Sequence, residues 1–293
     1  MIAVDWGTSN FRIFKVDADG NILARRSLPQ GILRVEGRNF AETLHTEVED
    51  WVAEGESQIL LCGMIGSREG WVEAPYLPCP VGIDDLAASV MKVPFAGAEV
   101  RLVPGVAGTD IDGVPEVMRG EETEAMGILD TCGGAGLVCF PGTHSKWIHL
   151  RDGKIVSFVT CMTGELYGAL SRSTILERTM TTGHPIDDTA FHRGIARSAD
   201  SGGLLHHLFG VRTLTLMDRL KEENSASYLS GLLIGHEVRA IIAAGQEIHL
   251  VGAAPLCSLY AQTIEACGGS ATVEDEDAAA RGLASIARRL KWS

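Results

Sequence analysis

Residues 1–16 read MIAVDWGTSNFRIFKV, an apolar run that breaks at Asp5 and resumes at Phe11. Two short apolar runs joined by small residues are typical of a β-hairpin, here with strands at 2–4 and 12–16. The joining turn contains Gly7, Thr8 and Ser9, and its backbone N–H groups can face an anion. The pattern predicts a phosphate-binding hairpin, although an ordinary Asp/Gly hairpin has the same pattern.

Asp5 stands where the first predicted strand ends. Magnesium keeps most of its waters and usually takes one or two protein carboxylates together with substrate phosphates. A single aspartate at this position is therefore sufficient to hold Mg²⁺ through water, and we predict Asp5 as the metal ligand.

A second hairpin of the same kind begins near the middle of the chain. Residues 137–141 form an apolar strand, Gly142 and Thr143 a tight turn, and residues 146–150 resume the strand. In each half a further turn of Asp and Gly, at 19–20 and 152–153, leads to a third strand at 22–28 or 155–160. Two such halves facing each other would clamp the phosphates of a nucleotide from both sides.

With these paired hairpins, at 5–12 and 141–147, the chain resembles the superfamily of sugar kinases, heat-shock chaperones and actin. The resemblance implies an α/β fold of two ribonuclease H-like lobes around a central nucleotide cleft, the actin/hexokinase-like ATPase fold. Residues 248–254 and the helix expected at 255–267 resemble the adenosine-binding motif of that superfamily, so that Gly252 and Ala253 would contact the nucleotide. Ala253 stands where the motif has its second glycine.

Four strings resemble those of 2-dehydro-3-deoxygalactonokinases, a likeness that spans nearly the whole chain: GMIGS (63–67), MRGEET (118–123), PGTHSKW (141–147) and LSGLLIG (229–235). The resemblance implies ATP- and Mg²⁺-dependent phosphorylation of the terminal hydroxyl of 2-dehydro-3-deoxy-D-galactonate. The product would be 2-dehydro-3-deoxy-6-phospho-D-galactonate, in bacterial galactonate or galactose breakdown.

Glu121 is the predicted catalytic base, because in related carbohydrate kinases a glycine and an acid open a helix just before the second hairpin. The usual acid there is Asp, so Glu121 is longer by one methylene, and the adjacent Glu122 is the alternative base. Both residues are equally well explained as favourable acids in the first turn of a helix.

The loop that starts at Gly63 is where related kinases hold their polyol, and it supplies Ser67, Arg68 and Trp71 as candidates. Ser67 can bond a hydroxyl, Arg68 can take a carboxylate in bidentate fashion, and Trp71 can stack on the carbon chain. Arg119 competes with Arg68 as the carboxylate partner. Either arginine could instead form a surface ion pair.

Beside the second turn, His144 and Lys146 could reach phosphate oxygens. A hydrogen-bonded structural histidine is the alternative for His144.

Composition fits these expectations. The 293 residues suffice for two domains. We predict an N-terminal lobe at 1–134, which contains the first hairpin, the sugar-acid loop and the catalytic acid. We predict a C-terminal lobe at 135–293, which contains the second hairpin and the adenosine motif. The net charge of −13 argues against nucleic acid and membrane partners. Seven cysteines without a C-x-x-C pair indicate reduced thiols, and with no signal peptide before Asp5 we expect a cytoplasmic protein.

Coarse structure follows from hydrophobic spacing. We expect helices near 39–53, 84–91, 164–173, 188–199, 203–219 and 225–244, and a terminal helix with an apolar stripe. A helix from Glu121 should end near 133–134, while residues 63–80 and 105–113 are expected to lack regular structure. The spacing of Gly231 and Gly235 permits close helix packing, within the chain or in a homodimer.

Two other functions remain open. The chain could phosphorylate another small acid, such as 2-keto-3-deoxy-gluconate or pantothenate. It could instead be a nucleotide-switched interaction protein of the same fold, although such proteins usually carry extra subdomains.

Overall fold

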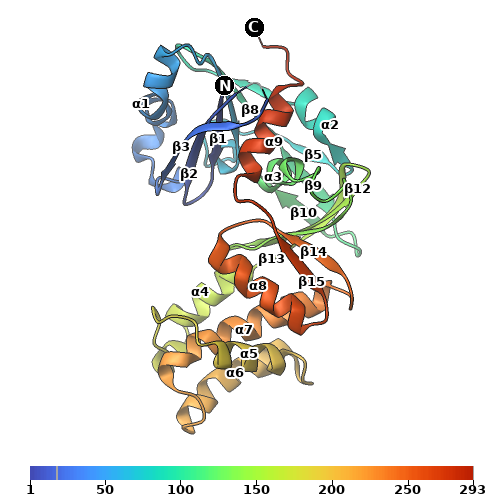
Figure 1. The fold of residues 1–293 in the computed structure, drawn as a ribbon. Helices are drawn as coiled ribbons and strands as arrows, with labels where there is room; N and C mark the ends of the chain where they lie inside the picture. The colour runs from blue at the N-terminus through green and yellow to red at the C-terminus, as the bar shows by residue number, and fades with distance from the viewer. Residues whose placement is uncertain (18, 293) are drawn as a thin grey trace. The chain divides into compact units, whose positions relative to one another are not determined.

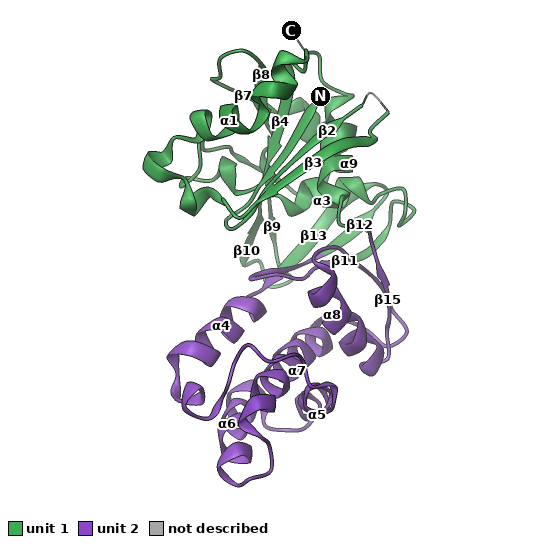
Figure 2. Cartoon of the chain, turned by 60° about the vertical axis from the view of Figure 1, so that its left-hand side comes forward, with its two compact units in different colours: residues 1–138, 148–159, 275–293 green, residues 139–147, 160–274 purple. Residues whose placement is uncertain are grey.

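The computed structural model describes residues 1–17 and 19–292 (Figure 1). The chain divides into two compact units, coloured separately in Figure 2: residues 1–138, 148–159 and 275–293 form unit 1, and residues 139–147 and 160–274 form unit 2. The predicted division into lobes at 134 and 135 stays a prediction.

The main sheet of unit 1 has six strands in the order β3-β2-β1-β4-β8-β7. Its first three strands form the predicted antiparallel meander: β1 (Ile2–Trp6), β2 (Phe11–Val16) and β3 (Ile22–Leu28). Strand β4 (Gln58–Cys62) is parallel to β1, β8 (Glu99–Leu102) is parallel to β4, and β7 (Met91–Val93) is antiparallel to β8. Because β1 is buried along its whole length, its sequence is nearly all apolar.

Helix α1 (Phe40–Ala53) confirms the predicted helical spacing, since its buried residues are Phe40, Leu44, Val48 and Trp51. These side chains join the same hydrophobic core as β1 and β4. The other helices of unit 1 are α2 (Ile83–Ala88), α3 (Glu121–Gly127) and α9 (Ala278–Ala287), with 3-10 helices at Ile32–Arg34, Glu36–Arg38 and Met64–Gly66.

Two of the segments expected to be irregular contain strands, so that expectation was wrong. Strand β5 (Tyr76–Pro78) pairs in parallel with β9 (Gly105–Thr109), and β10 (Pro115–Met118) pairs antiparallel with β9. Gly105 makes the pairing possible, because a Cβ there would lie 2.7 Å from both the carbonyl oxygen of Met118 and the ring of Tyr76. The glycine and proline residues that suggested loops therefore lie in the strands of a small three-stranded sheet.

The predicted end of the helix that begins at Glu121 was also wrong, because α3 stops at Gly127. A Cβ on Gly127 would lie 1.9 Å from the carbonyl oxygen of Ala278, so α9 packs directly against this last turn. Gly133 and Gly134 have φ of 61° and 74°, which a right-handed helix does not allow.

The third sheet has the order β15-β14-β11-β12-β13-β6. Strands β11 (Gly136–Phe140), β12 (Ser145–Arg151) and β13 (Lys154–Cys161) confirm the second predicted meander. The remaining strands are β14 (Glu247–Leu250), β15 (Ser270–Val273), which was not predicted, and β6 (Val81–Gly82).

Unit 2 adds five helices among its described residues: α4 (Thr163–Ser173), α5 (Asp188–Ser198), α6 (Gly203–Leu216), α7 (Glu222–Ile241) and α8 (Ala254–Ala266), with a 3-10 helix at Ile175–Thr179. Helices α5 and α7 pack without side chains between them at two points. A Cβ on Gly194 would lie 2.2 Å from the carbonyl oxygen of Tyr228, and one on Gly231 would lie 2.0 Å from that of Phe191. The close packing expected around Gly231 thus occurs within the chain.

Over residues 1–17 and 19–292, no helix has both the length and the apolar character that crossing a membrane requires. None of the seven cysteines forms a disulfide.

Candidate active site

The first predicted turn lies between β1 and β2. It closes with a hydrogen bond of 2.9 Å from the Gly7 N–H to the carbonyl oxygen of Asn10. Thr8 and Ser9 are exposed, and Gly31 packs behind them, since a Cβ there would lie 2.1 Å from the carbonyl oxygen of Thr8. The turn is therefore supported from one side and open on the other.

Asp5 lies one residue before the end of β1 and belongs to a charged cluster that the sequence analysis did not identify. Arg12 Nε donates to Asp5 Oδ2 at 2.7 Å, and Arg12 Nη2 donates to Glu124 Oε1 at 2.9 Å. The nearby carboxylate of Asp5 raises the pKa of Arg12 above its usual range. Burial raises the pKa of Glu124 to about 7, although the charge of Arg12 opposes it. The signal for Arg12 was its register, directly opposite Asp5 in the hairpin.

Two glycines bring other segments against Asp5. Gly63 follows β4 with φ of 91°, and a Cβ there would lie 3.0 Å from Asp5 Oδ1 and 2.8 Å from the carbonyl oxygen of Trp6. Gly120 precedes α3 with φ of 116°, and a Cβ there would lie 3.3 Å from the Cα of Gly63. The loop that starts at Gly63 and the first turn of α3 are thus brought close to Asp5.

The two candidate bases have different surroundings. Glu122 is fully buried and accepts hydrogen bonds from the Gly120 N–H (2.7 Å) and the Thr123 hydroxyl (3.0 Å). Burial raises the pKa of Glu122 to about 8. Glu121 is partly exposed, and its Oε2 accepts the Arg119 N–H at 3.2 Å. Only the carboxylate of Glu121 is therefore accessible to a ligand in this structure.

The three loop candidates are divided between the surface and the interior. The Arg68 side chain is 82% exposed and lies 3.5 Å from a carboxylate oxygen of Glu73. Trp71 meets the ring of Phe95 edge-on, with centroids 6.2 Å apart, and packs against the hydrophobic core. Ser67 is buried, and its hydroxyl has no hydrogen-bond partner.

Arg119 is buried as well. Its Nη2 donates to the carbonyl oxygen of Ala74 at 2.8 Å, and its guanidinium stacks on Tyr76 at 4.4 Å from the ring centroid. Nε and Nη1 have no partner, and with Ser67 Oγ they are the unsatisfied buried side-chain N and O atoms found among the described residues. A Cβ on Gly66 would lie 3.0 Å from Arg119 Nη1, so this arginine reaches the backbone just before Ser67.

In unit 2, the turn at Gly142 and Thr143 rests on the first turn of α4. The Glu165 N–H donates to the carbonyl oxygen of Thr143 at 2.9 Å, and a Cβ on Gly164 would lie 2.4 Å from that of Gly142. His144 Nε2 contacts a carboxylate oxygen of Glu165, and both side chains are about half exposed. The sequence analysis placed Gly164 at the start of a helix but predicted no role for it at this turn.

Lys146 is buried and donates from Nζ to the hydroxyl of Thr160 at 2.9 Å. Its neighbours Ser145 and Trp147 enter a buried network. Ser145 Oγ lies 2.7 Å from the hydroxyl of Tyr260, while Glu237 accepts from that hydroxyl at 2.8 Å and from Trp147 Nε1 at 2.7 Å. Strand β12 is thereby tied to α7 and α8, a connection the sequence did not indicate.

The segment predicted as the adenosine-binding motif, residues 248–254, also lies in unit 2. Gly252, between β14 and α8, has φ of 149°, and the Val251 N–H donates to the carbonyl oxygen of Cys139 at 3.0 Å. Ala253 has φ of −62° and is exposed, so its methyl group causes no backbone strain. The described residues include no cluster of three or more His, Cys, Asp or Glu side chains that could hold a metal ion.

The chain is similar to known proteins over nearly its whole length. The family model of 2-keto-3-deoxy-galactonokinases matches residues 5–286. The Escherichia coli 2-dehydro-3-deoxygalactonokinase is 33% identical, over 99% of this chain and 98% of its own length. A crystal structure of a Sinorhizobium meliloti protein proposed to be a 2-dehydro-3-deoxygalactonokinase is 35% identical with a TM-score of 0.90, covering 98% of both chains.

A more distant structure supports the fold alone. The activator of the 2-hydroxyisocaproyl-CoA dehydratase from Clostridium difficile, with bound ADPNP, has a TM-score of 0.54 at 12% identity and covers 98% of this chain and 94% of that one. The predicted α/β fold of the actin/hexokinase-like ATPase type is confirmed. With its sequence matched over almost its full length, the chain belongs to the 2-keto-3-deoxy-galactonokinase family.

Proposed function

We propose that this chain transfers the γ-phosphoryl group of ATP to the terminal hydroxyl of 2-dehydro-3-deoxy-D-galactonate, giving 2-dehydro-3-deoxy-6-phospho-D-galactonate in galactonate or galactose catabolism. Family membership supports the reaction. The observation that carries the sugar-acid part is the buried guanidinium of Arg119, with two nitrogens that lack partners beside the unpartnered hydroxyl of Ser67.

A buried donor without an acceptor costs free energy, more so when it is charged. A carboxylate would compensate the buried charge and accept a hydrogen bond from Nη1 or from Nε, but not from both, because the Nε–H points away from Nη1. We therefore assign the substrate carboxylate to Arg119 and a substrate hydroxyl to Ser67. Arg68 is exposed and already faces Glu73, which disfavours it for this role.

Glu121 is the proposed base. Its carboxylate is accessible, whereas that of Glu122 is buried and bonded to the start of its own helix. Glu121 would accept the proton of the terminal hydroxyl as that oxygen attacks the γ-phosphorus and ADP leaves. Glu122 would keep the backbone of Gly120 in place.

Phosphate binding is assigned to the two turns, which present Gly7, Thr8 and Ser9 in unit 1 and Gly142 and Thr143 in unit 2. Backbone N–H groups and hydroxyls in such turns are suited to anions. Lys146 and His144 would add positive charge, and Gly252 and Ala253 would contact the nucleoside.

The residue set at Asp5 fits magnesium, which prefers oxygen ligands and needs few from the protein. Asp5 Oδ2 is held by Arg12, while Oδ1 lies on the side of Gly63. When bound there through water, the ion would neutralise charge on the phosphate oxygens.

The setting of the enzyme is also a proposal. The seven free cysteines fit a cytoplasmic enzyme, and the net charge of −13 disfavours nucleic acid and membrane partners. We further propose that residues 1–134 and 135–293 act as its two lobes and that the enzyme works as a homodimer.

The direct test is ATP consumption by the wild-type protein with a panel of acids: 2-dehydro-3-deoxy-D-galactonate, its C4 epimer 2-keto-3-deoxy-gluconate, and pantothenate. We expect the highest kcat/KM with the galactonate derivative. Faster turnover of the epimer would reassign the substrate, and no turnover of any acid despite ATP binding would favour the nucleotide-switched class.

A further inference from the structure

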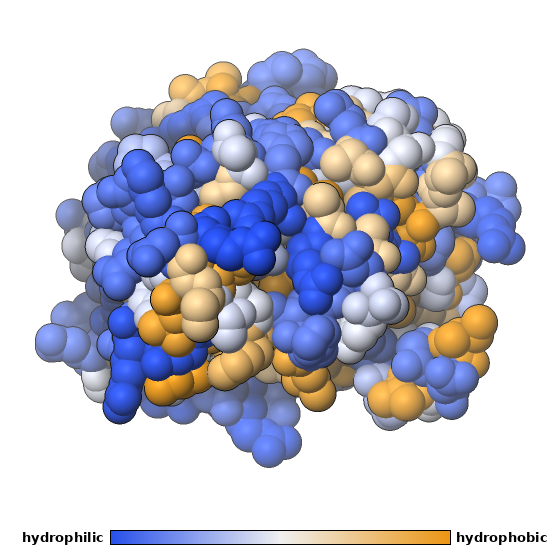
Figure 3. Space-filling model, turned by 90° about the horizontal axis from the view of Figure 1, so that it is seen from below, coloured by the Kyte–Doolittle hydropathy of each residue, from blue (hydrophilic) through white to orange (hydrophobic). Residues whose placement is uncertain are grey.

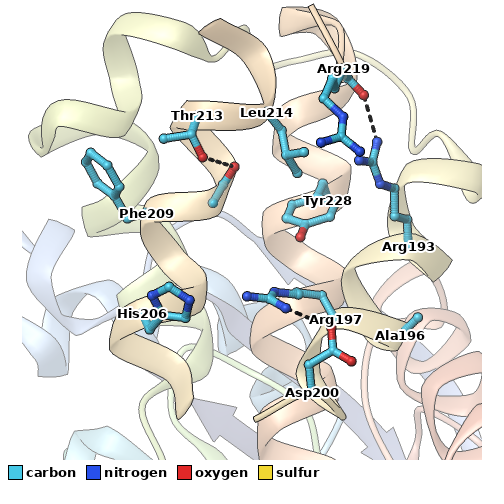
Figure 4. A pocket seen from close by; sticks show the side chains of 11 residues that line it. Arg193, Ala196, Arg197, Asp200, His206, Phe209, Thr213, Leu214, Arg219 and Tyr228 are labelled. Carbon is cyan, nitrogen blue, oxygen red and sulfur yellow. Dashed lines mark hydrogen bonds and ion pairs between the residues drawn. The ribbon is translucent and has the colours of Figure 1, made fainter. Parts of the chain in front are cut away.

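Unit 2 contains a cavity of about 580 Å³ among α5, α6 and α7 (Figure 4). None of the residues assigned above to ATP, magnesium or the sugar acid lines it. Its position in the fold therefore calls for a separate explanation.

Positive charge is concentrated in this cavity, although the chain as a whole carries −13. Arg193, Arg197 and Arg219 line it with a single carboxylate, that of Asp200, which pairs with Arg197 at 2.8 Å. Arg193 Nη1 donates to the carbonyl oxygen of Arg219 at 2.7 Å. In the described part of the chain, no carboxylate pairs with Arg193 or with Arg219, so two guanidinium charges remain uncompensated.

Apolar and aromatic side chains also line the cavity. Phe209 on α6 is 58% exposed, and Leu214 and Tyr228 lie deeper in the cavity lining. Arg193 lies over the ring of Tyr228, 5.9 Å from its centroid. Hydrophobic side chains also interrupt the hydrophilic surface on the face seen from below in Figure 3. The cavity thus offers an aromatic surface next to unpaired positive charge.

We propose that this cavity binds a phosphomonoester with an aromatic body. Guanidinium groups match the geometry of phosphate oxygens, and two of them compensate a dianion. Phe209 would stack on the aromatic body of the ligand. The volume lies within the range of ordinary small-molecule sites, roughly 300–1,000 Å³.

The test is a calorimetric titration of the full chain with phenyl phosphate, compared with inorganic phosphate and phenol. We expect one site per chain for phenyl phosphate, weaker binding of inorganic phosphate and no measurable binding of phenol. Arg219→Gln should weaken phenyl phosphate binding by about tenfold or more, because a charge-assisted contact is lost. The matched control is Arg178→Gln, an exposed arginine outside the cavity, which should bind as the wild type does.

Binding to the phosphate turns would show a different pattern, because it would not depend on Arg219. Thermal melting without ligand checks that Arg219→Gln is folded, and Phe209→Ala serves as a second variant if it is not. The proposal is overturned if phenyl phosphate does not bind, if neither variant weakens it, or if inorganic phosphate binds equally well.

Discussion

Gly120 and Gly63 touch across the proposed sugar-acid site: a Cβ on Gly120 would lie 3.3 Å from the Cα of Gly63. Both residues have positive φ, and Gly63 lies in turn against Asp5 Oδ1. The predicted base can therefore approach the end of β1 only because glycine, which has no side chain, stands at both positions.

Gly120→Ala should lower both stability and turnover. Alanine at φ of 116° is strained by about 1–2 kcal/mol, and its methyl group would push Gly63 and Glu121 apart, with a loss in kcat on the order of a hundredfold. Urea unfolding and steady-state kinetics measure the two effects. Gly55→Ala is the matched control, because φ is 106° there and nothing lies within 4 Å: it should lose stability and keep its kcat. Equal kcat in both variants would disprove the role of Gly120.

Glu121→Gln should reduce kcat by roughly a hundred- to ten-thousandfold, because the general base is removed. ATP binding, measured by titration, should be unchanged. Glu122→Gln should keep most of its activity, since this carboxyl is buried and positions Gly120. A large loss of kcat in Glu122→Gln alone would transfer the role of base to Glu122.

Stability should fall as the pH rises from about 5 to 8. The pKa of Glu122 is raised from 4.5 to about 8 and that of Glu124 to about 7, so over this range the folded chain holds protons that the unfolded chain has released. The free energy of unfolding then decreases with pH. Urea unfolding at several pH values should show a shallower decrease for Glu122→Gln, whereas parallel curves would contradict the assigned pKa.

Gly164→Ala should impair nucleotide binding. Its methyl group would lie 2.4 Å from the carbonyl oxygen of Gly142 and displace the second turn, so the KM for ATP should rise on the order of tenfold. Gly168→Ala in the same helix is the control, because its methyl group meets only the flexible end of Arg172. A KM for ATP that rises in neither variant would argue against phosphate binding at this turn.

The sequence predicted the two meanders well, because their apolar runs and Asp-Gly turns are local signals. Strands β5 and β9 were missed because glycine and proline suggest loops, while their pairing depends on contacts distant in sequence. The end of α3 was missed for a related reason, since Ala278, which packs on Gly127, lies far along the chain.

Within the site, residue types and their order supplied the candidate residues, whose roles stay predictions. The choice between Arg68 and Arg119 required burial and hydrogen-bond partners, which no local pattern contains. The choice between Glu121 and Glu122 likewise required the structure, because these neighbours in one helix turn differ in burial: Glu121 is partly exposed and Glu122 is buried.

The central claim is that the buried guanidinium of Arg119 holds the carboxylate of the sugar acid during phosphorylation. The most direct measurement is the KM for 2-dehydro-3-deoxy-D-galactonate in the wild type, Arg119→Lys, Arg119→Gln and Arg68→Gln, with melting curves to confirm folding. We predict a KM higher by about tenfold or more in Arg119→Gln, a smaller rise in Arg119→Lys, and a KM near the wild-type value in Arg68→Gln. An unchanged KM in folded Arg119→Gln, or the larger rise in Arg68→Gln, would contradict the claim.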